Sequence, residues 1–385
     1  MTDQAQNIEL IRDSIRALCK KFPEAYWREM DEKKEYPEEF INTLTEEGWL
    51  SVLIPEAYGG AGLGMTEAGV ILEEINRSGG NAGAGHAQMY TMGALLNHGN
   101  KDQKERYLPK IASGELRLQA FGITEPTAGS DTTSIETTAV KKGDKYIVNG
   151  QKIWISRSEH SDLMLLLART TPKEQVEKKT DGISLFILDM NDQKNNITIE
   201  PINTMINHST TEIFFEDTEI PEENLIGEEG KGFRYVLSGM NAERILIASE
   251  SIGDGKYFVD KAVQYANERV VFNRPIGQNQ GVQFPIAKSY MDIEAAKLMR
   301  DKAAEMFDQG LKCGPEANMA KYLSSEAAWK AANATMDTYG GYGFAAEYDI
   351  ERKFREARLF IVAPVTNNLI ASYIGQHVLG LPRSF

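Results

Sequence analysis

The chain has 385 residues, of which 42% are hydrophobic and 25% are charged, and its formal net charge is -14. The length provides about two to three domains with ample material for a buried core, whereas the acidic balance argues against a nucleic-acid partner, which requires a basic surface. No apolar run reaches the ~18 residues of a membrane span, and two cysteines exclude a disulfide framework and a four-cysteine metal site, so we expect a cytoplasmic protein.

The first part of the chain, residues 8–114, has the periodicity of helices. Ile11, Ile15 and Leu18 recur at spacings of three and four residues, which places them on one helical face. Residues 55–60, Pro-Glu-Ala-Tyr-Gly-Gly, interrupt the pattern with turn-forming residues. We therefore expect a helical region that contains a turn-rich loop.

The middle part, from about residue 117 to residue 227, has the pattern of strands. Short runs rich in β-branched and apolar residues occur at 145–148, 163–168, 183–188 and 212–215. Turn residues are expected to separate them at 142–144, 149–150 and 189–191. The pattern predicts a β-domain between two helical regions.

From Phe233 onward the helical periodicity returns in long segments. The stretch 233–271 is too long for one ordinary helix, and Gly253 and Gly255 predict a break within it. Further helices are expected at about 282–310, 314–339 and 366–379. The order of helices, strands and helices indicates an α+β protein of several segments.

One segment, residues 122–131, combines turn residues with hydroxyl groups and reads Gly-Ile-Thr-Glu-Pro-Thr-Ala-Gly-Ser-Asp. Thr124 and Ser130 flank its turn, which can present several backbone N–H groups to a polar ligand or a phosphate. Residues 154–156, Trp-Ile-Ser, follow on an expected strand. Taken alone, such a segment is more often a surface loop.

Two further segments carry glycines and a suitably placed arginine. Residues 337–344, Asp-Thr-Tyr-Gly-Gly-Tyr-Gly-Phe, contain Gly340 and Gly341, which permit close approach of the backbone to a ligand. Residues 269–276, Arg-Val-Val-Phe-Asn-Arg-Pro-Ile, begin with Arg269, whose planar guanidinium can donate two hydrogen bonds to a pyrophosphate. A Gly-Gly-x-Gly run by itself is weak evidence, because many turns contain it.

Together these segments resemble the signatures of the acyl-CoA dehydrogenases, and the resemblance spans nearly the whole chain. It implies an α+β fold with an N-terminal helical domain (1–116), a middle β-domain (117–227) and a C-terminal four-helix-bundle domain (228–385). It also implies FAD as cofactor, acyl-CoA as substrate, electron-transfer flavoprotein as electron acceptor, and a homotetramer. The implied reaction is α,β-dehydrogenation of the acyl-CoA to the trans-2-enoyl-CoA.

By this resemblance Thr124 bonds the pyrimidine edge of the flavin, Trp154 packs against the flavin ring, and Arg269 reaches the FAD of a neighbouring subunit. The implied cofactor-binding residues are Phe121, Ile123, Thr124, Gly129, Ser130, Trp154, Ile155, Ser156, Arg269, Phe272, Gln280, Asp337, Gly340, Gly341, Thr366 and Asn368. The implied substrate-binding residues are Ser130, Asn241, Arg244 and Val365. No metal is expected, because the histidines show no metal-ligand spacing.

The implied reaction needs a carboxylate that removes a proton from Cα while a hydride leaves Cβ for flavin N5, and burial raises the pKa of such a base toward ~6–7. Pro364 stands where most of the family carries this glutamate, and proline has no acid. A minority, including isovaleryl- and long-chain-type enzymes, carries the glutamate on an earlier helix, which here matches Glu243. We predict Glu243 as the catalytic base, with Glu250 as a second candidate.

Pro364 also lacks the backbone N–H that family members direct at the thioester oxygen. Hydrogen bonds to that oxygen stabilise the enolate-like charge that develops during proton removal. We expect the Val365 N–H, a water molecule or a local shift of the backbone to supply the missing bond.

Other functions remain compatible with the sequence, because a fold does not fix an activity. The substrate could be an acyl or aminoacyl group held on a carrier protein. The chain could also be a flavin monooxygenase or oxidase, or a flavin-bound interaction protein without turnover. The presence of Glu243 favours a dehydrogenase over the last two, while the length and branching of the acyl group are not indicated.

Overall fold

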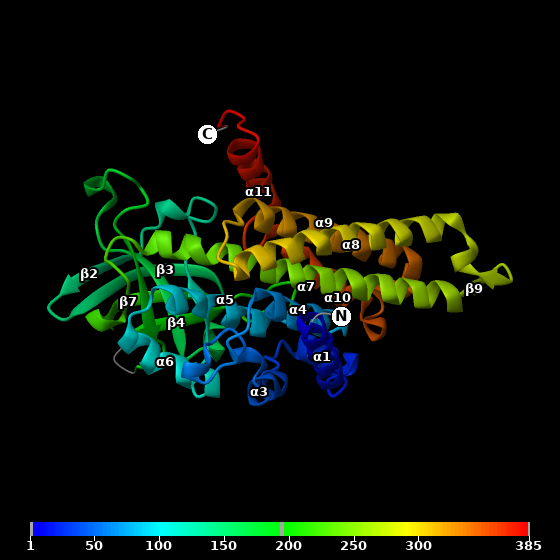
Figure 1. The fold of residues 1–385 in the computed structure, drawn as a ribbon, viewed down its shortest axis with the longest axis horizontal. Coiled ribbons are helices and arrows are strands. Elements are labelled where there is room, and N and C mark those ends of the chain that lie inside the picture. Colours follow the sequence, from blue (N-terminus) through cyan, green and yellow to red (C-terminus); the bar gives the residue numbers. More distant parts are fainter. Residues whose placement is uncertain (1–2, 193–195, 384–385) are drawn as a thin grey trace. The chain divides into compact units, whose positions relative to one another are not determined.

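A computed structural model describes residues 3–192 and 196–383, which form two compact units (Figure 1). Unit 1 holds the residues up to 33, residues 64–82 and the residues from 241 onward, and unit 2 holds residues 34–63 and 83–240. The helical N-terminal region is therefore divided between the two units. The last passage from one unit to the other lies within helix α7 (Gly232–Glu268).

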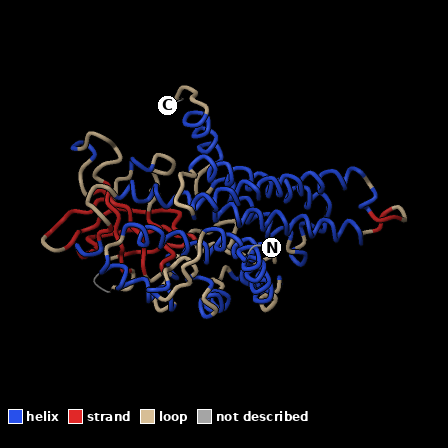
Figure 2. The backbone as a smooth tube through the Cα atoms, in the orientation of Figure 1, coloured by secondary structure: helices blue, strands red, loops and turns tan. Residues whose placement is uncertain are grey.

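Unit 2 is built on a mixed eight-stranded sheet, whose strands Figure 2 shows in red. The strand order is β6-β7-β3-β2-β4-β5-β8, and β1 pairs in parallel with β4. The predicted strand-rich middle region is thus confirmed. The strands are β1 (Leu118–Gly122), β2 (Thr138–Lys142), β3 (Lys145–Ser156), β4 (Leu163–Arg169), β5 (Ile183–Asp189), β6 (Ile197–Pro201), β7 (Thr210–Pro221) and β8 (Leu225–Ile226).

Strand β4 lies between two apolar cores, and all of its residues are buried. Leu163, Leu165 and Leu167 belong to a core that includes side chains of α5 and α6. Met164 and Leu166 belong to the core on the other face of the sheet. This is the two-residue period of a strand, applied to a segment that is apolar throughout. The helices of unit 2 outside α7 are α3 (Glu38–Glu46), α5 (Gly83–His98) and α6 (Lys101–Ser113).

Two predicted turns of unit 2 have different outcomes. The turn at 142–144 joins β2 and β3, as expected. The turn expected at 149–150 is wrong, because Asn149 and Gly150 lie inside β3, where its pairing with β7 shifts by a β-bulge. Gly150 has a φ of 150°, and a Cβ on it would lie 2.6 Å from the hydroxyl oxygen of Thr137. The glycine permits this close approach within a strand and does not end the strand.

Unit 1 consists mainly of helices. The predicted helices at 282–310 and 314–339 are confirmed as α8 and α9, and Ile15 and Leu18 of α1 are buried as expected. The helix expected at 366–379 is a short α-helix followed by a π-helical turn, Ile374–Val378. The helices are α1 (Asp3–Cys19), α2 (Glu24–Lys33), α4 (Met65–Arg77), α7 from residue 241, α8 (Gln280–Asp308), α9 (Gly314–Tyr339), α10 (Ile350–Val362) and α11 (Asn367–Tyr373).

The break predicted in the long helix is wrong, because α7 is continuous over 37 residues. A Cβ on Gly253 would overlap the carbonyl oxygen of Glu73 on α4, and a Cβ on Gly255 would lie 2.8 Å from Ile293 on α8. The two glycines therefore let α4 and α8 pack closely against α7. This packing outweighs the roughly 1 kcal/mol by which glycine disfavours a helix interior.

The stretch Ile350–Val378 is long and apolar enough, by length and composition alone, to cross a membrane. It is not one helix, since the non-helical residues 363–366 separate α10 from α11. Within α10, the buried Arg352 and Lys353 form ion pairs with Glu356, at 3.1 and 2.8 Å. Buried ion pairs of this kind are typical of a helix packed inside a protein, so length and composition do not by themselves make this stretch a span.

Candidate active site

The first predicted segment forms a tight turn between β1 and β2 in unit 2. Glu125 and Ala128 exchange two backbone hydrogen bonds, of 3.2 and 3.1 Å. The carbonyl oxygen of Thr124 accepts a hydrogen bond from the N–H of Ile153, at 2.9 Å. The turn therefore lies directly beside the part of β3 that carries Trp154, and the structure brings together the two parts of the first signature.

A buried ion pair, which the sequence reasoning missed, fixes this turn. The Glu125 carboxylate accepts hydrogen bonds from the ammonium of Lys152 at 2.8 Å and from the N–H groups of Glu136 and Thr137 at 2.6 and 3.0 Å. Lys152 also donates to the carbonyl of Ile123 at 2.9 Å. Burial raises the pKa of Glu125, but the charge of Lys152 and the hydrogen bonds that the carboxylate accepts together outweigh it, so the net pKa is lowered. Burial lowers the pKa of Lys152 to about 8.

Trp154 projects from β3 with an unusual backbone conformation. Its φ is 61°, in the left-handed region that bulky residues rarely adopt, and the register of β3 against β7 shifts between Ile153 and Ile155. Its side chain is 58% exposed, whereas Ile155 is buried. A β-bulge therefore presents a flat indole on the surface of unit 2, against which a planar ring system can pack. Ser156, half-buried, ends the strand.

Gly129 and Ser130 are exposed in the loop that follows the turn. A Cβ on Gly129 would meet no atom within 4 Å. Asp131 accepts hydrogen bonds from the hydroxyls of Ser134 and Thr133, at 2.5 and 2.7 Å, and these bonds lower the pKa of Asp131. The acid of this segment is thus engaged within its own loop, while Gly129 and Ser130 leave their side of the loop open.

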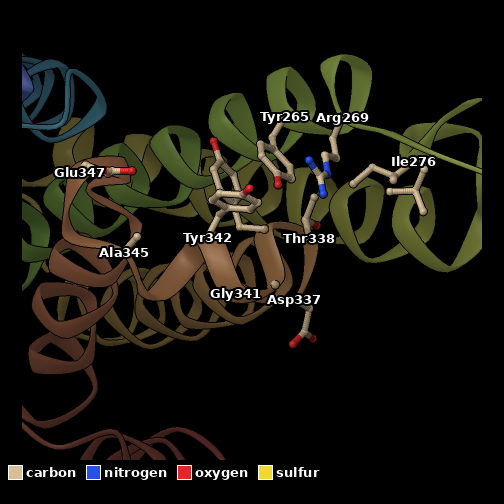
Figure 3. A pocket seen from close by; sticks show the side chains of 12 residues that line it. Tyr265, Arg269, Ile276, Asp337, Thr338, Gly341, Tyr342, Ala345 and Glu347 are labelled. Carbon is tan, nitrogen blue, oxygen red and sulfur yellow. The ribbon is translucent and has the colours of Figure 1, made fainter.

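The second and third predicted segments meet in a pocket of unit 1 with a volume of about 550 Å³. The Arg269 guanidinium lies 5.4 Å from the ring centre of Tyr342, and the ring of Tyr265 stacks on that of Tyr339 at 4.0 Å. Figure 3 shows that the Asp337 carboxylate points away from Arg269. The pocket thus combines a cation with aromatic walls. The predicted residues that line it are Arg269, Asp337, Gly340 and Gly341.

Four other predicted cofactor residues lie outside this pocket. Phe272 is 93% exposed, between the short strands β9 (Val270–Val271) and β10 (Arg274–Pro275). Neither Phe272 nor Gln280 is among the residues that line the pocket. The hydroxyl of Thr366 accepts a hydrogen bond from the N–H of Leu369 at 3.2 Å and so caps α11, on which Asn368 is exposed.

The predicted base lies on α7 in unit 1. Glu243 is only 6% exposed. The adjacent Arg244 donates a hydrogen bond to the side-chain oxygen of Asn241 at 3.1 Å, and burial lowers the pKa of Arg244. The three predicted residues therefore occupy one turn of the helix, and the carboxylate among them is withdrawn from water. Glu250, the second candidate, is also buried.

Pro364 and Val365 lie in the non-helical link between α10 and α11. The carbonyl of Val365 accepts a hydrogen bond from the ammonium of Lys321 at 2.7 Å. The N–H of Val365 donates to none of the residues that the structure describes. The Val365 N–H, which we expect to replace the N–H that Pro364 lacks, therefore has no hydrogen-bond acceptor among the described residues.

Comparison with known proteins decides the family. Models of the acyl-CoA dehydrogenase N-terminal, middle and C-terminal domains match residues 5–115, 120–218 and 230–379. An acyl-CoA dehydrogenase of Bacillus subtilis (strain 168) is 35% identical over 374 residues, which cover 96% of this chain and 97% of that protein. The chain belongs to the acyl-CoA dehydrogenase family.

Solved structures of similar proteins have the same fold as this acyl-CoA dehydrogenase. A glutaryl-coenzyme A dehydrogenase in complex with glutaryl-CoA matches with a TM-score of 0.91 and 30% identity, over 100% of this chain and 97% of that one. Butyryl-CoA dehydrogenase from Megasphaera elsdenii matches with a TM-score of 0.90 and 29% identity, over 98% and 99%. The predicted α+β fold, with helical, β and helical parts in that order, is confirmed. The protein is an FAD-dependent oxidoreductase that dehydrogenates an acyl-CoA thioester.

Residues of both units of this acyl-CoA dehydrogenase fit FAD. In unit 2 the exposed indole of Trp154 lies next to the turn of Thr124, and in unit 1 Arg269 forms no ion pair with any described residue. A Cβ on Gly340 or Gly341 would meet no atom within 4 Å. Such features do not serve the packing of the chain itself, and they suit the flat rings and the pyrophosphate of a dinucleotide. The described residues hold no group of three or more His, Cys, Asp or Glu side chains that could bind a metal ion.

Some residues of the acyl-CoA dehydrogenase site could have been found from the sequence. Tyr265 lies four residues before Arg269, the residue that directly follows α7, and that helical spacing places both on the same side. Lys152 stands between Gln151 and Ile153 in a strand, and this position does not show whether the lysine is buried against an acid. Nothing in the sequence shows that this acid is Glu125, since the contact depends on how the turn folds.

Proposed function

We propose that Glu243 is the base of the reaction and removes the α-proton of an acyl-CoA, so that the trans-2-enoyl-CoA is formed. The observation that carries this proposal is the burial of Glu243 on α7 in a chain that has Pro364 where most of the family carries its glutamate. A carboxylate withdrawn from water is a stronger base than one at the surface. FAD, when bound, would supply the acceptor for the hydride that leaves Cβ.

The other substrate-binding residues have roles that follow from their placement in unit 1. Arg244 donates a hydrogen bond to the side chain of Asn241, and this pair orients the helix surface around Glu243. The Val365 N–H donates to the thioester oxygen, where negative charge develops as the proton leaves. Support comes from the lack of any described acceptor for that N–H.

We infer two regions of contact with FAD. In unit 2, Thr124, Trp154, Ile155 and Ser156 would hold the isoalloxazine ring, and Gly129 and Ser130 would hold the adjoining phosphate region. In unit 1, the pocket of Arg269 and Gly341 would receive the pyrophosphate part of the FAD of a neighbouring subunit. The remaining residues that we propose to contact FAD are Phe121, Ile123, Phe272, Gln280, Asp337, Gly340, Thr366 and Asn368.

We propose further that the enzyme is a cytoplasmic homotetramer that passes electrons to electron-transfer flavoprotein. Exposed apolar side chains recur every seven residues along α8, at Phe284, Met291 and Leu298, which favours burial against another subunit. Two free, buried cysteines suit a reducing compartment. We retain 116/117 and 227/228 as the proposed domain boundaries.

The decisive experiment is anaerobic bleaching of the bound flavin by a panel of acyl-CoA thioesters, with FAD content measured for every variant. We expect Glu243→Gln to keep its FAD and to bleach at least ~100-fold more slowly, the usual effect of losing a general base. Glu250→Gln, the matched control on the same helix, should bleach at the wild-type rate. Full activity of Glu243→Gln with Glu250→Gln inactive would assign the base to Glu250.

The panel also includes an acyl thioester on a carrier protein. Bleaching by the CoA thioesters at low concentration supports the proposed substrate. Bleaching by the carrier thioester alone would replace CoA with a carrier protein as the substrate partner. A flavin that no thioester reduces would contradict dehydrogenation.

A further inference from the structure

A buried lysine holds the segment that carries the proposed thioester-oxygen donor. Lys321, on α9, is fully buried. Its ammonium donates to the carbonyl oxygen of Val365 and to the side-chain oxygen of Asn367, both at 2.7 Å. One cation thus bonds two residues of the link and first turn that follow Pro364.

Asn367 completes the attachment of this segment to α9. Its side-chain nitrogen donates to the hydroxyl of Ser325 at 3.1 Å and to the carboxylate of Glu326 at 2.8 Å. The Ser325 hydroxyl in turn lies 3.3 Å from the Asn367 oxygen. Three polar side chains of α9, at positions 321, 325 and 326, therefore fix the position of one short link, and all of these contacts lie within unit 1.

The attachment leaves little freedom to the Val365 N–H. On one side, the pyrrolidine ring of Pro364, the residue before Val365, fixes the φ angle of Pro364 itself. On the other side, the Val365 carbonyl is held by Lys321. The N–H between these two constraints has no acceptor among the described residues. A donor held in this way needs no reorganisation when charge develops on its acceptor, which is the condition for electrostatic stabilisation.

Burying the Lys321 ammonium costs free energy, which argues that this side chain does more than fill space in the core. Burying an ammonium costs several kcal/mol unless it is well bonded. Burial lowers the pKa of Lys321 to about 7, the negative charge of Glu326 raises it, and the positive charge of Arg244 lowers it further. A methionine would fill similar space without this cost, but it could not hold the Val365 carbonyl.

We propose that Lys321 is a positioning residue for the reaction, which holds Val365 and Asn367 so that the Val365 N–H is aimed at the thioester oxygen during α-proton removal. The inference rests on the proposed function. Lys321 itself does not touch the substrate; it acts through the backbone of Val365.

The test uses FAD-loaded enzyme and an acyl-CoA analogue with sulfur in place of the Cβ methylene, which can lose its α-proton but no hydride. Titration with pH of the long-wavelength absorbance that its enolate gives beside oxidised flavin yields the apparent pKa of the bound α-carbon. We expect Lys321→Met to raise that pKa by about one unit or more, a tenfold weaker stabilisation of the enolate. The same variant should lower kcat about tenfold and leave KM nearly unchanged.

Lys330→Met, on the exposed face of the same helix, is the matched control and should match the wild type. Unchanged enolate pKa and kcat in FAD-loaded Lys321→Met would overturn the inference. If Lys321→Met does not retain FAD, Asn367→Ala decides by the same criterion, because it removes one side of the attachment and keeps the lysine. A wild-type enzyme that forms no enolate with the analogue would refute the proposed function itself, and the inference with it.

Discussion

Replacing Glu125 with glutamine tests whether the buried pair Glu125–Lys152 holds the turn that we propose to bind the flavin. The carboxylate receives three hydrogen bonds, one from Lys152 and two from backbone N–H groups. A glutamine offers one oxygen, and its NH₂ group would face one of these donors. The substitution therefore leaves a buried ammonium without its counter-charge and at least one backbone donor without an acceptor.

The magnitude follows from the burial of both partners, whose side chains are 0% and 5% exposed. Removing one partner of a buried ion pair costs about 3–5 kcal/mol. At roughly 2 °C per kcal/mol, the thermal transition should fall by about 6–10 °C. The turn that carries Thr124 should loosen at the same time, so that purified Glu125→Gln contains less FAD than the wild type.

The assay is thermal unfolding of wild type and variant at equal FAD concentration, together with the FAD content after gel filtration. The matched control is Glu222→Gln, because Glu222, which directly follows β7, pairs with Lys141 of β2 and both side chains are half exposed. A surface pair of this kind contributes about 0–1 kcal/mol. A Glu125→Gln protein that melts with the wild type and keeps its FAD would refute the role assigned to the pair.

The pH dependence gives an independent check of the same pair. The folded-state pKa of Glu125 is lowered, so its contribution to stability is present above its unfolded pKa of about 4.5 and is lost as the pH falls through the folded value. The difference in stability between wild type and Glu125→Gln should therefore be full at pH 7 and shrink below about pH 4.5. A difference that stays constant into that acid range would show that the charge of Glu125 does not contribute.

Two further substitutions test packing and cofactor binding. Gly253→Ala should destabilise unit 1 by about 1–3 kcal/mol in denaturant unfolding, since its methyl group would overlap the carbonyl of Glu73. The control is Gly239→Ala on the same helix, where a Cβ would meet no atom within 4 Å, and it should be neutral or slightly stabilising. Equal effects at both positions would contradict the packing argument. Arg269→Met should weaken FAD retention by tenfold or more in dilution experiments, while the exposed Arg274→Met should not; retention equal to wild type in both would remove the pocket from the FAD site.

Periodicity predicted the long elements well, because each buries a regular stripe of apolar side chains. The helices α8 and α9 begin and end within about two residues of their predicted bounds. The two errors both concern glycines, at Gly150 and Gly253. In the sequence a glycine signals a break, but in each case it serves close approach of a neighbouring segment. Whether a glycine ends an element or lets another element pack against it depends on tertiary contacts, which periodicity does not contain.

The sequence predicted which segments carry the candidate site, but it did not predict the contacts between those segments. The turn of Thr124 and the pocket of Arg269 lie in the segments expected to carry them. The left-handed conformation of Trp154 and the direction of Asp337 could not be inferred, because they result from a β-bulge and from the end of a helix.

Two buried lysines illustrate a rule that connects these observations. Lys152 bonds the carbonyl of Ile123 beside the proposed flavin site, and Lys321 bonds the carbonyl of Val365 beside the proposed thioester-oxygen donor. Each ammonium thus fixes a backbone segment that has no regular partner in a helix or sheet at that point. Irregular backbone is what a ligand can bond, because its N–H groups are not used by secondary structure. A chain that keeps such a segment unpaired needs another way to hold it, and in this protein a buried, costly charge does so at both places.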